Sequence, residues 1–302
     1  MIFVIFYTII LMFVDRESIT TQCLTALKQW YETMIPTLFP MMLLSSIAVD
    51  TGIALEIGSI CNKTLFRFLK LSDQGCYCLI TGFLFGFPMG AKTASDMMEK
   101  NYISAKEAEY LLSFINCIGP MYIIHFIHTM FQRYSLWTLI TGIYILPLFY
   151  GLLLRYTAYK TFVFHTSDTI HSSKNYNKYN TLCFPEALYQ CVPKCGKNIL
   201  LLGGYMILFQ ISFIPLEYFL QSLNIVTQVF YPLLEMTGGL LRIAPDTSLA
   251  LILFYLSFGG ACCLLQTYSI IHPTRLSVRK YAFHKLLLGL TSALYGIILE
   301  IF

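Results

Sequence analysis

Long uncharged stretches, separated by short clusters of charged residues, make up most of the chain. Stretches without Asp, Glu, Lys or Arg cover residues 33–49, 74–91, 110–132, 134–154, 198–216, 218–234, 247–274 and 286–299. A membrane-spanning helix needs about 20 mainly apolar residues, so each stretch is a candidate to cross or enter the bilayer. The pattern predicts an all-α, polytopic membrane protein with about eight transmembrane or re-entrant helices.

Proline and glycine interrupt several of these stretches. The interruptions are Pro36 and Pro40, Gly86 to Gly90 around Pro88, Gly119-Pro120, and Gly259-Gly260. Because hydrocarbon cannot hydrogen-bond to free backbone groups, irregular backbone at membrane depth is buried in protein or lines a wet cavity. Interrupted segments in matching positions of two halves are typical of transporter binding sites. The alternative is kinked helices that pack closely at small residues.

A weak internal repeat divides the chain into two halves. Asp73 precedes an apolar run that ends near Gly86, and Asp246 precedes one that ends near Gly259. The offset is 173 residues both between the two aspartates and between the two glycines. We therefore expect an N-terminal membrane helix and amphipathic connector in 1–27, a first membrane repeat in 28–154, a polar cytoplasmic linker in 155–197, and a second membrane repeat in 198–302. The positive-inside rule places the linker in the cytoplasm.

The composition agrees with a membrane protein and excludes other classes. Only 12% of the 302 residues are charged and 57% are hydrophobic, whereas about a quarter of a soluble domain is charged. A soluble enzyme is excluded, and the net charge of +4 without a basic stripe argues against nucleic-acid binding. The expected partners are the lipid bilayer and a small solute, and self-association into a homo-oligomer stays open.

No catalytic or metal-binding motif accompanies this pattern. The sequence has no GxSxG, HExxH, Walker A or GxGxxG motif, so we expect neither enzymatic activity nor a cofactor. Cys183, Cys191 and Cys195 lie near His165 and His171, but their spacing fits no standard zinc site. We therefore expect free thiols and no bound metal.

One motif is specific enough to indicate a family. Gly86-Phe87-Pro88-Met89-Gly90-Ala91-Lys92 resembles the G-[YF]-P-x-G-A-K signature of the YlbJ (SpoVV) family of sporulation integral membrane proteins, within the nucleoside-recognition or Gate-domain group. Residues 36–40, 107–116 with Gly119-Pro120, and Gly259-Gly260 with Gln266 resemble further segments of that family. Ile115, Gly119 and Cys262 depart from it by replacing polar residues, which leaves fewer groups to contact a solute.

The resemblance implies a fold similar in plan to concentrative nucleoside transporters and a role in endospore formation. It also implies passage of dipicolinic acid across the cell membrane, which in sporulating cells would be the outer forespore membrane. A planar dianion of this kind would bind N–H groups at helix N-termini and a cation. The candidate substrate-binding residues are Gly86, Pro88, Gly90, Lys92, Asn116, Gly119, Pro120, Gly259, Gly260 and Gln266.

Each of these residues has an alternative role. Lys92 could extend to the lipid headgroups, and Asn116 could join two helices by a hydrogen bond. We interpret Glu235 and Arg242 as a structural ion pair and place Glu107 in a solvated first helical turn. The leading hypothesis is a transport protein for a small anionic or polar metabolite, and the alternative is a non-transporting membrane scaffold or assembly factor for sporulation.

Overall fold

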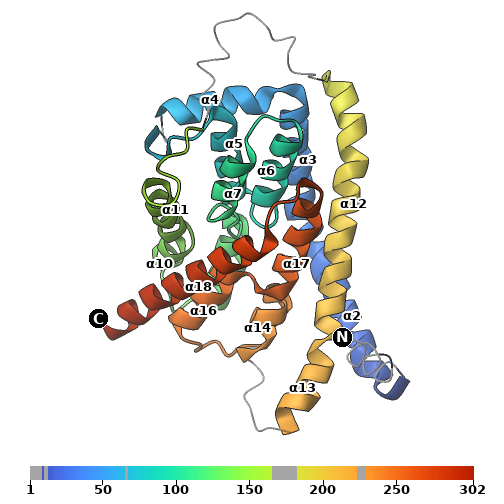
Figure 1. Ribbon diagram of the computed structural model, residues 1–302. Coiled ribbons are helices and arrows are strands. Elements are labelled where there is room, and N and C mark those ends of the chain that lie inside the picture. Colours follow the sequence, from blue (N-terminus) through green and yellow to red (C-terminus); the bar gives the residue numbers. More distant parts are fainter. Residues whose placement is uncertain (1–8, 10–12, 65–66, 165–181, 223–228) are drawn as a thin grey trace, which may run out of the picture.

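The computed structural model describes residues 9, 13–64, 67–164, 182–222 and 229–302 (Figure 1). All regular structure within these ranges is helical, which confirms the predicted all-α class. The helices long and apolar enough to cross a membrane, among the described residues, are Arg16–Thr51, Leu136–Tyr156, Phe184–Leu220, Leu249–Thr274 and Val278–Ile301. The protein is therefore a polytopic membrane protein. Residues 1–8 and 10–12, which belong to the predicted N-terminal membrane helix, lie outside the described residues.

Two long helices form one side of the molecule. The first runs through α2 (Arg16–Gln29), the π-helical turn η1 (Trp30–Met34) and α3 (Ile35–Thr51), and it packs beside α12 (Phe184–Ile211). The first helix is continuous across residue 28, where the sequence predicted a boundary. α12 already includes residues 184–197 of the predicted linker, because Ala187 and Cys191 form an apolar face that packs on Ile47 of α3.

A helical hairpin stands at the centre of the fold. After α3, α4 (Ile53–Thr64) lies across one end of the molecule, and a short 3-10 turn, η2 (Arg67–Leu69), leads to the hairpin of α5 (Asp73–Leu84) and α6 (Met89–Glu99). Ser72 caps α5 through its side chain, which accepts a hydrogen bond from the Gly75 N–H at 3.0 Å. The two hairpin helices pack on each other and are joined by residues 85–88.

Glu107 contacts the start of this hairpin. The sequence predicted a solvated side chain, but it is buried. The residue lies in the first turn of α7 (Ala105–Leu112). Its Oε1 accepts hydrogen bonds from the backbone N–H and the hydroxyl of Ser72, both at 2.8 Å. The carboxylate therefore satisfies free donors at the start of α5, which explains why it tolerates burial.

Interrupted helices build the rest of the fold. The first half continues through α7, an extended segment, α8 (Pro120–Tyr122), η3 (Ile123–Ile127), α9 (His128–Met130), α10 (Leu136–Ile140), η4 (Thr141–Ile145) and α11 (Leu146–Tyr156). The second half comprises α13 (Phe213–Ser222), α14 (Tyr231–Leu234), α15 (Met236–Leu240), α16 (Leu249–Phe258), α17 (Gly260–Ile271), η8 (His272–Thr274) and α18 (Val278–Ile301). α18 packs along α16, and α17 packs against both α6 and α12.

The contact between the two long helices depends on Gly203 of α12. The Trp30 indole donates a hydrogen bond from Nε1 to the Ile199 carbonyl at 2.9 Å. A Cβ atom added at Gly203 would lie 2.8 Å from Nε1 of Trp30, whereas one added at Gly204 would meet no atom within 4 Å.

We expect Gly203→Val to lower the free energy of unfolding by about 1–3 kcal/mol, because the new methyl groups would overlap the indole. Gly204→Val makes the same change of residue type at the next helical position, which faces outward, and serves as the control. Thermal denaturation of the detergent-solubilised protein measures both variants. Equal melting temperatures for the two variants would contradict this packing.

Candidate functional site

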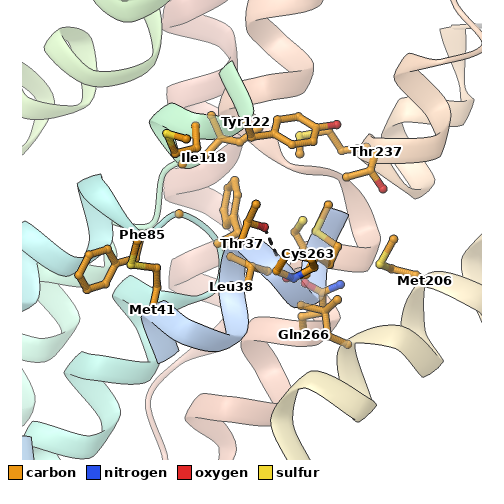
Figure 2. A pocket seen from close by; sticks show the side chains of 18 of the residues that line it. Thr37, Leu38, Met41, Phe85, Ile118, Tyr122, Met206, Thr237, Cys263 and Gln266 are labelled. Carbon is orange, nitrogen blue, oxygen red and sulfur yellow. Dashed lines mark hydrogen bonds between the residues drawn. The ribbon is translucent and has the colours of Figure 1, made fainter. Parts of the chain in front are cut away.

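Three helix interruptions line a cavity of about 230 Å³ (Figure 2). They are the tip of the α5–α6 hairpin, the extended segment before α8, and the junction of α14 with α15. The N-terminal part of α3, together with α12 and α17, closes the remaining sides. The lining is mainly apolar, with polar groups contributed by Thr37, Tyr122, Glu235, Thr237 and Gln266.

Two glycines bring the first two interruptions into backbone contact. Gly86 has φ +81°, and a Cβ atom there would lie 2.5 Å from the Gly119 nitrogen. Any side chain at Gly86 would therefore be strained by its own backbone conformation and would push the hairpin tip away from the α7–α8 segment. This close approach fixes the wall of the cavity formed by Gly86 and Gly119.

The interruption between α16 and α17 lies next to the hairpin tip. Gly259 and Gly260 have φ values of +86° and +78°. A Cβ atom at Gly259 would lie 3.0 Å from Cζ of Phe87, and one at Gly260 would lie 2.8 Å from the Pro232 carbonyl oxygen. The structure therefore brings the two glycine-bearing segments singled out in the sequence, around residues 86 and 259, to one place.

Only some of the predicted site residues face this cavity. Gly86, Gly119 and Gln266 are part of its lining, whereas Pro88, Gly90, Lys92, Asn116, Pro120, Gly259 and Gly260 are not. Gly90 packs against Gly82 and Ile115, since a Cβ atom there would lie 3.0 Å from the Gly82 Cα. Its role in the fold is close helix packing.

Lys92 lies in a separate polar cluster between α6, α3 and α12. Its side chain is 2% exposed, so it does not extend to the headgroups. Nζ donates to Ser46 Oγ at 2.7 Å and pairs with Asp96 at 2.5 Å. Asp96 also pairs with Lys194 of α12 at 2.9 Å. These contacts hold α6 against its neighbours.

Asn116 joins the extended segment before α8 to α17 and α18. Its Nδ2 donates to the Tyr281 hydroxyl at 2.7 Å and contacts Thr267 Oγ1 at 3.3 Å. The Oδ1 atom is buried and has no hydrogen-bond partner among the described residues. The amide thus links helices, as the alternative interpretation proposed, and still has an unused acceptor.

Glu235 is the charged residue of the cavity that the sequence interpretation missed. It is 3% exposed and accepts hydrogen bonds from the N–H groups of Thr237 and Gly238 at 2.9 and 2.6 Å. The predicted ion pair with Arg242 is wrong, because the Arg242 guanidinium donates to Gln22 and stacks over Phe213 and Tyr231. An isolated acid next to the uncharged stretch 218–234 was the available signal.

Lys285 of α18 is a second buried charge that the sequence did not single out. Its side chain is 2% exposed, and Nζ donates to the Asn116 carbonyl at 3.0 Å. Nζ also lies 4.3 Å from the centre of the Phe87 ring, which is itself part of the cavity wall. In the sequence this lysine follows a cluster of basic residues, Arg275, Arg279 and Lys280, so nothing in the sequence distinguishes it as a buried side chain.

The cysteines of α12 serve packing in the described structure. Cys191 Sγ lies 3.3 Å from Asp50 Oδ2, and Cys195 Sγ lies 3.5 Å from Ser46 Oγ. His165 and His171 lie outside the described residues. Among the residues that are described, no three His, Cys, Asp or Glu side chains come together as metal ligands would.

The facing glycines provide a matched pair of substitutions. Gly86→Ala should destabilise the protein, because positive φ alone disfavours alanine by about 1–3 kcal/mol and the methyl group would overlap the Gly119 nitrogen. Gly119→Ala should be close to wild type, since its Cβ atom would lie no nearer than 3.5 Å to other atoms. Melting temperatures in detergent measure both; a larger loss for Gly119→Ala would refute the contact geometry.

Comparison with known proteins supports the resemblance on which the site was predicted. The chain is 26% identical over 309 aligned positions to the sporulation integral membrane protein YlbJ of Bacillus subtilis (strain 168), covering 91% of this chain and 76% of the relative. Neither a protein-family model nor a solved structure matches the chain. The alignment extends over nearly the whole chain, beyond the motif at 86–92, and the chain is therefore similar to this sporulation integral membrane protein over almost its full length.

Proposed function

We propose that this protein transports a small polar or anionic metabolite across a membrane during endospore formation. The observation that carries the proposal is the cavity of about 230 Å³ at which three helix interruptions converge. In secondary transporters, interrupted helices expose backbone groups to the solute while the rest of each helix remains anchored in the bilayer. A scaffold has no need for such a cavity.

The size of the cavity supports a metabolite as the solute. A volume of about 230 Å³ is slightly below that of ordinary small-molecule sites, which span roughly 300–1,000 Å³, so the cavity suits a small solute. The mainly apolar lining, with a few polar groups, suits a flat organic molecule better than a hydrated ion. Dipicolinic acid, which the family resemblance suggests, has this character and is our candidate solute, with the outer forespore membrane as the candidate location.

The Glu235 carboxylate constrains how an anion is carried. Two backbone N–H groups and the Thr237 hydroxyl already share its negative charge. A dianion placed in the same cavity would still be repelled unless a cation enters with it. We therefore propose that an anionic solute is transported together with a proton or a metal cation, which places Glu235 at the coupling step.

Transport is tested by accumulation of radiolabelled dipicolinate in vesicles containing the purified protein, compared with empty vesicles. Met206 of α12 lies in the cavity lining and is buried, so Met206→Trp should abolish accumulation by filling the cavity. Leu208 is on the same helix but 55% exposed, so Leu208→Trp should accumulate the solute as wild type does.

Both variants are first checked for monodisperse elution and for unchanged helicity. Accumulation by wild type and Leu208→Trp but not by Met206→Trp supports transport through the cavity. No accumulation by the wild-type protein would reject dipicolinate transport. Equal accumulation by all three proteins would show that the solute passes elsewhere.

A further inference from the structure

Lys285 is a buried cation whose contacts leave its charge unbalanced. Its ammonium group donates to one carbonyl oxygen, that of Asn116, at 3.0 Å and lies 4.3 Å from the centre of the Phe87 ring. No carboxylate of the described residues lies within 4.0 Å of Nζ, whereas the exposed Lys280 on the same helix pairs with Glu109 at 3.1 Å.

A lysine in this position is expensive to retain for structure alone. A buried ammonium without a counter-ion loses its hydration, and one carbonyl and one aromatic ring replace it only in part. A methionine of similar length would fill the same space without that penalty. Charged residues inside membrane proteins usually mark the path of a solute or ion.

The surroundings of Lys285 have a second unsatisfied polar group. Asn116, whose carbonyl accepts from Lys285, is 1% exposed, and no described residue hydrogen-bonds to its buried Oδ1. An ammonium with spare donors, on α18, and an amide oxygen with a spare lone pair, on the segment before α8, thus meet at Asn116. A carboxyl-bearing ligand would supply acceptors to the ammonium.

Phe87 contacts both this cluster and the cavity. It belongs to the cavity lining, and its ring lies against the Lys285 ammonium. Phe87 sits at the hairpin tip, directly after Gly86, so a movement of that tip would carry the ring with it. Displacing the ring would open the ammonium to the cavity.

We propose that Lys285 binds a carboxylate of the transported solute once the Phe87 ring has moved off the ammonium. The inference rests on the proposed transport function and adds the residue that recognises the carboxylate of the solute. Lys285 in α18 and Glu235 at α15 then act on different components, the anion and the accompanying cation.

Equilibrium binding of radiolabelled dipicolinate, which is pyridine-2,6-dicarboxylate, to the purified protein in detergent tests this proposal. A charged hydrogen bond contributes about 1.5–3 kcal/mol, so Lys285→Met should weaken binding about 10- to 150-fold. Lys285→Arg, which keeps the charge, should lose less affinity than Lys285→Met. Lys280→Met removes an exposed lysine of the same helix and should bind as wild type does.

The dicarboxamide of pyridine, used as an unlabelled competitor, separates charge recognition from a change of shape. Lys285→Met should lower the affinity for the dicarboxylate and leave the affinity for the dicarboxamide unchanged. The ratio of dicarboxamide affinity to dicarboxylate affinity should therefore rise by the same factor. Unchanged dicarboxylate affinity in Lys285→Met, or an equal loss for both compounds, would overturn the proposal.

If Lys285→Met does not elute as a monodisperse protein, Lys285→Gln replaces it and is judged by the same criteria. The vesicle experiment distinguishes the two proposals. Accumulation by wild type with unchanged binding in the Lys285 variants rejects only the assignment of Lys285. Absence of both accumulation and binding in the wild-type protein rejects dipicolinate transport and this inference together.

Discussion

The backbone contact between Gly86 and Gly119 is the constraint on which the functional site depends. It joins the tip of the α5–α6 hairpin to the extended segment before α8, so close that a Cβ atom at Gly86 would lie 2.5 Å from the Gly119 nitrogen. Two other features follow from this contact. One wall of the cavity is main chain, and Phe87 is held against both the cavity and Lys285. A larger residue at Gly86 would disturb both at once.

The fold class could be predicted from the sequence because it follows from composition and from the length of the uncharged stretches. Eight uncharged stretches and 12% charged residues leave few alternatives to a polytopic helical membrane protein. The interruptions were also visible, since glycine and proline act locally on the backbone. The segments around Gly86 and Gly259 lie next to each other in the structure. The sequence paired them as matching positions of two halves, but the contact itself required the coordinates.

Side-chain direction was the part that the sequence could not supply. Lys92 and Lys285 both adjoin apolar stretches, yet Lys92 is neutralised by Asp96 while Lys285 meets a carbonyl and a ring. The difference arises from which helix faces each lysine, and those helices are distant in sequence. Glu235 was misjudged for a similar reason. Arg242 lies seven residues away and was the nearest cation in sequence, but the aromatic rings of Phe213 and Tyr231 hold it elsewhere.

The two buried charges give the proposed transport cycle its physical logic. Glu235 accepts hydrogen bonds from two backbone N–H groups, which stabilise its buried carboxylate, and it lines the cavity from which the proposed cation would approach. Lys285 lies under the Phe87 ring, so the proposed anion would reach it once the hairpin tip moves. The contact that holds this tip is backbone against backbone at Gly86 and Gly119, without interlocking side chains that a movement would have to separate. Binding of the anion to the ammonium would therefore stabilise the displaced position of the tip, which is how a solute can drive a change of conformation.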